Sequence, residues 1–195
     1  MELSDIEKVK RFITSLIRKE LNDEDLKRES NEFFKDSANL LNKDFMEALL
    51  ARRVDNALVN VNIIVEYAYR GSPVAQLFTG VGRLVGLGAE KNESEGIFWL
   101  KRSYGGKNTN AAMILYTVYA SGIGVFEDMA KARTYLNGAA DLNVPKAQYM
   151  LAQMLFSGEG GAVDEDHAIE YMYKAAKNNC QDAIEFLSKN ELTLS

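Results

Sequence analysis

Residues 145–180 read PKAQYMLAQMLFSGEGGAVDEDHAIEYMYKAAKNNC, and residues 109–144 directly before them read TNAAMILYTVYASGIGVFEDMAKARTYLNGAADLNV. Small residues stand at the same places in both stretches. Ala111 and Ala147 are 36 residues apart, and Ala75 and Ala183 extend this series by one step in each direction. A fixed spacing of this kind is typical of a protein built from stacked structural repeats.

Glycine, aspartate and tyrosine follow the same spacing. The matching sets are Gly86, Gly122 and Gly158; Gly88, Gly124 and Gly160; Asp128 and Asp164; Ala132 and Ala168; Tyr135 and Tyr171; and Ala139-Ala140 with Ala175-Ala176. Glycine after a helix takes a left-handed conformation at little cost, and aspartate before a helix accepts a hydrogen bond from its first turn. Alanines let two helices approach closely. Each unit is therefore predicted to be a helix, a glycine turn and a second helix.

The pattern resembles the Sel-one-like repeat, a relative of the tetratricopeptide repeat. Residues 109–144 and 145–180 carry it most fully. The unit at 73–108 is weaker, with Ala75, Gly80, Gly86-x-Gly88 and Trp99 present but Asn92 in place of the aspartate and Gly96, Ser103 and Tyr104 in place of small alanines. The resemblance implies an all-α fold, an α/α superhelix in the form of a right-handed solenoid of helix-turn-helix repeats.

The segments outside the three units are predicted to shield the ends of the array, because an open solenoid needs such caps. Residues 1–54 are interpreted as an N-terminal helical cap, with a partner-binding role as the alternative. Apolar spacing predicts helices over about 4–21, 25–42 and 44–53. A further helix over about 55–69 is predicted from the repeat register, although this segment is rich in β-branched residues. Residues 55–72 are interpreted as a degenerate half-repeat, and residues 181–195 as a truncated C-terminal repeat or cap.

The composition of the chain argues against several classes of function. The chain has 28 acidic and 23 basic residues, a formal net charge of -5 and no basic stripe, which argues against a nucleic-acid partner. No apolar run is long enough for a membrane span, and the N-terminus lacks the pattern of a secretion signal. Cys180 is the single cysteine and is predicted to be a small apolar filler. We expect a cytoplasmic protein without cofactor or metal.

Two stretches suggest chemistry, and both fit the repeat better. Residues 80–88 are rich in glycine but lack the Gly-Lys-Ser/Thr ending of a phosphate-binding loop. His167 lies among Asp164, Glu165 and Asp166, which leaves a hydrolase as a remote alternative. The same acidic residues are expected at the start of a helix, where the helix dipole favours them.

The first helices of tetratricopeptide-like arrays line the concave side, so their outward residues are the candidate protein-binding site. Helical spacing selects Phe78, Val81, Leu84, Ile114, Thr117, Ala120, Met150, Gln153 and Phe156. An acidic edge with Glu159, Glu165 and Asp166 is predicted to join them. The open alternative is that the N-terminal helices fold back and cover this apolar surface.

The predicted function is therefore a non-enzymatic module that binds another protein, and the chain's acidity suits a basic partner. In the family that these repeats resemble, small bacterial members include immunity proteins and signalling regulators. One version is accordingly a bacterial cytosolic immunity protein that inhibits a toxin. The alternative is a structural, assembly or signalling adaptor that acts by self-association. The partner's identity and the oligomeric state do not follow from the sequence.

Overall fold

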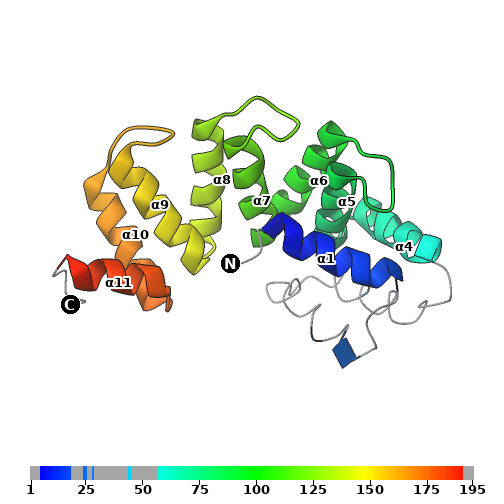
Figure 1. The fold of residues 1–195 in the computed structure, drawn as a ribbon, viewed down its shortest axis with the longest axis horizontal. Coiled ribbons are helices and arrows are strands. Elements are labelled where there is room, and N and C mark those ends of the chain that lie inside the picture. Colours follow the sequence, from blue (N-terminus) through cyan, green and yellow to red (C-terminus); the bar gives the residue numbers. More distant parts are fainter. Residues whose placement is uncertain (1–4, 19–23, 26–27, 29–43, 45–56, 191–195) are drawn as a thin grey trace. The chain divides into compact units, whose positions relative to one another are not determined.

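The computed structural model describes residues 5–18, 24–25, 28, 44 and 57–190, and all regular structure in these ranges is helical (Figure 1). The helices are α1 (Asp5–Arg18), α4 (Ala57–Arg70), α5 (Pro73–Val85), α6 (Glu93–Gly105), α7 (Thr109–Ala120), α8 (Met129–Asp141), α9 (Pro145–Ser157), α10 (Glu165–Lys177) and α11 (Gln181–Lys189). The helices predicted over 25–42 and 44–53 lie almost wholly outside the described residues.

The chain divides into two compact units, and the boundary falls inside α7. Unit 1 comprises residues 1–114, and unit 2 comprises residues 115–195. In unit 1, helix α5 packs against α4, α6 and α1. In unit 2, helix α9 packs against α8 and α10, and α10 packs against α11. Each unit thus contains the helix pairing that the repeat pattern predicts.

The second helix of every repeat begins at a side-chain cap. The carboxylates of Asp128 and Asp164 accept hydrogen bonds from the backbone N–H groups of Lys131 (2.9 Å) and His167 (3.2 Å). The predicted N-caps are therefore confirmed. Asn92 caps α6 in the same way, so its replacement of aspartate leaves the first repeat with a working helix start.

Left-handed backbone conformations follow the repeat as well. The six glycines of the two predicted series have φ between 65° and 75°. A further set was not anticipated: Lys107, Asn143 and Asn179 have φ of 60° to 62° at the turns between repeats. These three residues are also 36 apart. Asparagine, which stands at two of the three positions, adopts this conformation more readily than most residues, so the 36-residue spacing could have indicated these turns.

Two buried glutamines tie a first helix to the second helix before it. The Gln148 Nε2 atom donates to the carbonyl oxygen of Ala140 at 3.1 Å, and Gln76 donates to Ala68 at the same distance. Helix α4 therefore makes the same bond to α5 that α8 makes to α9. At this bond, α4 meets α5 as a second helix meets the first helix of the next repeat. The bounds of the half-repeat at 55–72 stay a prediction.

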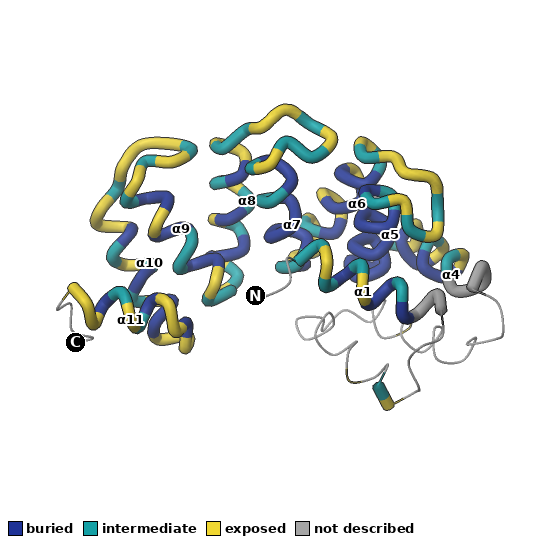
Figure 2. Tube along the Cα trace, viewed as in Figure 1, coloured by how far each residue is buried: buried dark blue, intermediate teal, exposed yellow. Residues whose placement is uncertain are grey.

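The helix pair α5–α6 approaches most closely at two glycines. A Cβ atom on Gly96 would lie 2.8 Å from the Gly80 carbonyl oxygen and 2.9 Å from the Leu84 backbone nitrogen. Both neighbours are backbone atoms, which cannot move aside by a rotamer change. Figure 2 shows α5 as the most continuously buried helix of unit 1. Gly96, which made the first repeat look weak, is therefore a packing requirement.

We expect Gly96→Ala to lower the free energy of unfolding by up to about 2 kcal/mol, because overpacking costs about 1–3 kcal/mol and the helix propensity gained offsets about 1 kcal/mol of it. The matched control is Gly105→Ala in the same helix, where an added Cβ meets nothing within 4 Å. This control should be neutral or slightly stabilising. Urea unfolding followed by circular dichroism measures both changes, and equal midpoints for the two variants would contradict the packing argument.

Candidate protein-binding surface

In unit 1, the predicted binding residues of α5 are buried, and helix α1 packs on one of them, Phe78. Phe12 on α1 packs against Phe78 on α5 with ring centroids 5.3 Å apart. Phe78, Val81 and Leu84 are at most 3% exposed. The prediction that these three residues contact a partner is therefore wrong, and the alternative in which the N-terminal region folds back is correct for this helix.

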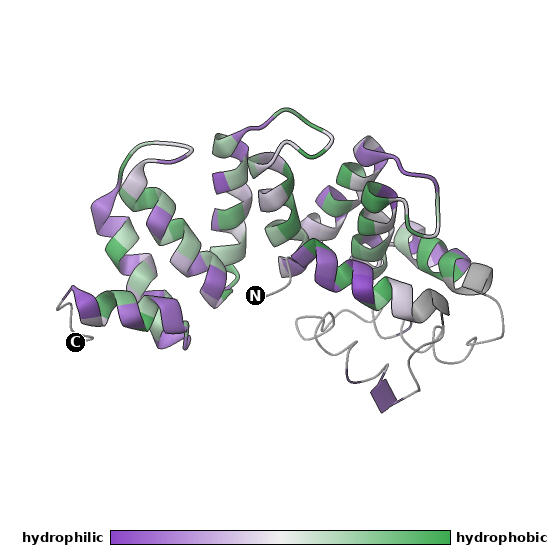
Figure 3. Cartoon of the chain, in the orientation of Figure 1, coloured by the Kyte–Doolittle hydropathy of each residue, from purple (hydrophilic) through white to green (hydrophobic). Residues whose placement is uncertain are grey.

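Helix α1 covers α5 because its apolar residues recur at helical spacing on one side, whereas its other side is hydrophilic (Figure 3). Val9 and Ile13 are buried beside Phe12.

Ile114 on α7 is also fully buried and must be removed from the predicted surface. Its side chain belongs to the hydrophobic core and has no area left for a partner.

The remaining predicted residues lie in unit 2 and are accessible. Gln153 is exposed, and the others, Thr117, Ala120, Met150 and Phe156, are half-buried. The acidic edge, defined as Glu159, Glu165 and Asp166, is exposed. The predicted surface residues that follow residue 114 are therefore accessible in the structure.

Helices α9 and α11 together form the best-defined part of this surface, which we call the α9–α11 face. Phe156 packs against Phe186 with ring centroids 5.8 Å apart. The Gln153 amide donates to the Tyr149 hydroxyl at 3.0 Å, and both rings and Tyr149 are half-buried. Half-buried aromatic side chains beside an exposed amide are common in protein interfaces.

An ion pair closes one end of the α9–α11 face. The Lys146 Nζ atom lies 2.6 Å from an Asp182 carboxylate oxygen and 5.4 Å from the centre of the Tyr149 ring. Lys146 and Asp182 are 36 residues apart and occupy the same position on successive first helices. Sequence reasoning missed this pair and Phe186, although the repeat register could have placed them side by side.

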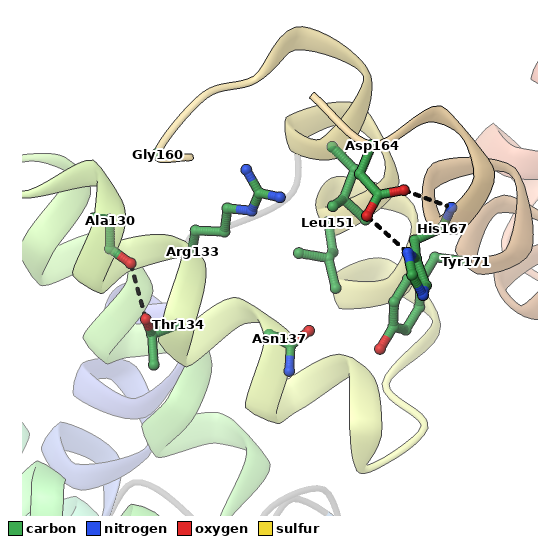
Figure 4. Close-up of a pocket in the computed structure, with 10 residues that line it drawn as sticks. Ala130, Arg133, Thr134, Asn137, Leu151, Gly160, Asp164, His167 and Tyr171 are labelled. Carbon is green, nitrogen blue, oxygen red and sulfur yellow. Dashed lines mark hydrogen bonds and ion pairs between the residues drawn. The ribbon is translucent and has the colours of Figure 1, made fainter. Parts of the chain in front are cut away.

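A second concave feature of unit 2 is a groove of about 530 Å³ between α8 and α10 (Figure 4). Leu151 and Leu155 of α9 contribute apolar side chains to it. The polar lining residues are Arg133, Thr134, Asn137, Asp164, His167 and Tyr171. This groove was not predicted from the sequence, because its walls combine residues of α8, α9 and α10.

Most polar groups of the groove are bound to other parts of the protein. The Arg133 guanidinium donates to the carbonyl oxygens of Glu159 (3.4 Å) and Ala162 (3.1 Å), which fixes the α9–α10 loop against α8. The Tyr171 hydroxyl donates to Asp141 at 2.8 Å. Burial, together with this bond to a carboxylate, raises the Tyr171 pKa to about 12. These contacts give the groove a structural role in joining α8 to the following repeat.

The Asp164–His167 pair is explained by helix capping. The His167 Nδ1 atom lies 2.7 Å from an Asp164 oxygen, and the same carboxylate group accepts the His167 backbone N–H. Asp128 and Lys131 form the same arrangement one repeat earlier, with 2.8 Å between charged atoms. Because a lysine fills the position equally well, imidazole chemistry is not needed there.

Neither a metal site nor a membrane span appears in the part of the chain that the structure describes. Its histidine, cysteine and acidic residues form no group of three or more that could hold a metal ion. None of its helices is long and apolar enough to cross a membrane. Cys180 is buried among apolar residues of unit 2, as predicted.

Comparison with known proteins fits the geometry of the repeats. The Sel1 repeat model matches residues 73–108, 110–144 and 145–180. The chain belongs to the Sel1 repeat family. Among solved structures, a Sel1 repeat protein from Oxalobacter formigenes is 32% identical, with a TM-score of 0.60, over 65% of this chain and 95% of that protein. The predicted family and the all-α repeat fold are thereby confirmed.

Two further Sel1-type structures support the fold alone. A protective antigen of uropathogenic Escherichia coli is 20% identical, with a TM-score of 0.64, over 88% of this chain and 37% of that protein. Helicobacter pylori cysteine rich protein B is also 20% identical, with a TM-score of 0.54, over 68% of this chain and 98% of that protein.

Two curated relatives carry functional names. Both are called exopolysaccharide production negative regulator, one from Rhizobium meliloti and one from Rhizobium leguminosarum. They are 40% and 37% identical to this Sel1 repeat protein over 73 residues. The match covers 35% of this chain and only 27% of each relative. Membership of the family supports a role in protein–protein interaction.

The capping pair gives a pH prediction. The hydrogen bond and charge of Asp164 raise the pKa of His167, and the bonds from His167 lower the pKa of Asp164. The histidine contribution to stability is present below about pH 6.5 and is lost as pH rises through its raised pKa. The aspartate contribution is present above about pH 4 and is lost as pH falls through its lowered pKa.

His167 is the only histidine, so an NMR titration of untagged protein gives a single imidazole signal. We expect its pKa to lie above the ordinary value near 6.5 and to fall towards it in Asp164→Asn. Asp166→Asn removes a neighbouring charge without removing the hydrogen bond and should move the pKa less. An unchanged pKa in Asp164→Asn would show that the pair does not persist in solution.

Proposed function

We propose that this Sel1 repeat protein binds a protein partner through the α9–α11 face, and that the acidic edge selects a basic partner. The observation that carries the proposal is the exposed Gln153 between the half-buried Tyr149 and Phe156 rings. These residues lie on the part of the first-helix surface that is accessible in the structure. Aromatic rings contribute large contact areas in interfaces, and surrounding charges direct association.

A cytosolic immunity role is the more specific form of this proposal. The net charge of -5 and the exposed Glu159, Glu165 and Asp166 suit a basic toxin as the bound protein. A second candidate, negative regulation of a cellular process by protein binding, is favoured by the names of the two rhizobial relatives. Both forms require the same surface, so the surface is tested first.

The test uses Gln153→Arg, because Gln153 is exposed and an arginine there introduces bulk and positive charge without opening the core. Tagged full-length protein is used to capture partners from its own cells. The affinity of the captured partner is then measured by isothermal titration. We expect Gln153→Arg to weaken binding at least about tenfold, which corresponds to roughly 1.4 kcal/mol.

Asn62→Arg on α4 is the matched control, because Asn62 is also an exposed amide on a helix and lies in unit 1. This control should bind the partner as the wild type does. Equal loss in both variants, or retention in both, would contradict the α9–α11 face as the binding site. Protection of cells from a basic captured protein would separate immunity from regulation.

A further inference from the structure

Unit 1 carries an exposed aromatic patch on its second helices α4 and α6. Tyr69 on α4 is 72% exposed, and Phe98 on α6 is 51% exposed. Both rings contact Trp99 edge-on, with centroid distances of 4.9 Å and 5.4 Å. Trp99 itself is only 3% exposed. A buried indole thus supports two exposed rings in one contiguous surface.

Positive charge surrounds this patch. The Arg102 guanidinium lies 5.8 Å from the centre of the Phe98 ring and 5.9 Å from that of Trp99, and Lys101 beside it is exposed. Arg70 follows Tyr69 and lies 4.4 Å from the centre of the Tyr67 ring. The rings therefore have cationic side chains beside them in a chain whose net charge is -5.

The neighbouring carboxylates are already engaged. Glu66 pairs with Arg70 at 3.7 Å. Glu95 lies 3.3 Å from Arg83 and accepts a hydrogen bond from the Trp99 indole at 3.4 Å. Because these two carboxylates pair with other groups, they do not offset the positive charge that Arg102 contributes beside the rings.

The repeat scaffold does not explain the exposed rings. At the position of Phe98, the next two repeats have Thr134 and Glu170. At the position of Tyr69, the later repeats have Gly105, Asp141 and Lys177. The Trp99 position, by contrast, is aromatic throughout, with Tyr135 and Tyr171. The inner ring belongs to the repeat, and the two outer rings were added to this unit.

We propose that this patch, defined by Tyr69, Phe98, Trp99, Arg70 and Arg102, docks an acidic protein segment that carries a large apolar side chain. The apolar side chain would pack on the Tyr69 and Phe98 rings, and a carboxylate would pair with Arg102. Aromatic residues and arginine together are the composition that dominates binding energy at interfaces. Arginine also binds carboxylates through two parallel hydrogen bonds.

An acidic protein segment fits the patch better than single-stranded nucleic acid does. Nucleic-acid binding rests on many cations along a backbone path, whereas this patch has few and the chain has a net charge of -5. The Trp99 ring is also too buried to stack on a base. The proposal does not depend on the α9–α11 face, because the two surfaces lie in different units.

The experiment selects short random peptides displayed on phage against the immobilised full chain. Selected peptides are synthesised, and their dissociation constants are measured by fluorescence polarisation. We expect acidic peptides with an aromatic or large aliphatic residue. Their affinity should fall at least about tenfold for Arg102→Glu and for Phe98→Ala, and should weaken as salt is raised.

Lys177→Glu is the matched control, because it reverses an exposed helical cation in unit 2. It should leave peptide affinity unchanged, and circular dichroism should show native helix content in every variant, since exposed substitutions rarely cost much stability. Gln153→Arg should also bind the peptides normally, which separates this patch from the α9–α11 face.

Two outcomes would overturn the proposal. The first is a set of selected peptides that are not acidic, or whose affinity is the same for wild type, Arg102→Glu and Phe98→Ala. The second is tight binding of a single-stranded oligothymidylate that is lost in Arg102→Glu, which would assign the patch to nucleic acid.

Discussion

Close approach of paired helices is the constraint on which the rest of the structure depends. In the first repeat, α6 approaches α5 at a residue that has no side chain. This residue is Gly96 in the first repeat, and the fully buried Ala132 and Ala168 take its place in the next two. Interiors are packed densely, so even one added carbon at such a crossing must displace backbone. The spacing of 36 residues returns the chain to an equivalent crossing each time.

The first helices differ in what lies over their outer side. In unit 1 the amphipathic helix α1 buries Phe78 on α5. In unit 2 the equivalent side of α9 carries Gln153 and Phe156, which remain accessible. Burial of apolar surface stabilises the fold, whereas accessible aromatic surface is available for binding. One repeated backbone thereby supports a covered face and an open face.

Polar residues at repeat-defining positions mainly hold the protein together. Asp164 and His167 cap a helix just as Asp128 and Lys131 do, and Arg133 fixes a loop through two carbonyl oxygens. Residues outside the repeat pattern are the ones with free surface to offer. Phe98 and Gln153 belong to this second group. Recognition in a repeat protein therefore depends on positions that the repeat itself does not prescribe.

The amino-acid sequence by itself determined the repeat register, the helix caps, the glycine turns and the all-α fold. These features depend on backbone preferences of single residues and on contacts at fixed spacing, which a linear pattern records. The left-handed conformation of Lys107, Asn143 and Asn179 was clear only in the structure, because lysine rarely adopts it and asparagine also occurs in many other conformations.

Only the tertiary structure decided which of the predicted surface residues are accessible. The burial of Phe78 depends on Phe12, far away in the chain, and Trp99 supports the ring of Tyr69 from another helix. The groove beside Arg133 likewise needs two helices to form its walls. Such contacts join residues at unrelated spacings, so periodicity could predict the helices but not what covers them.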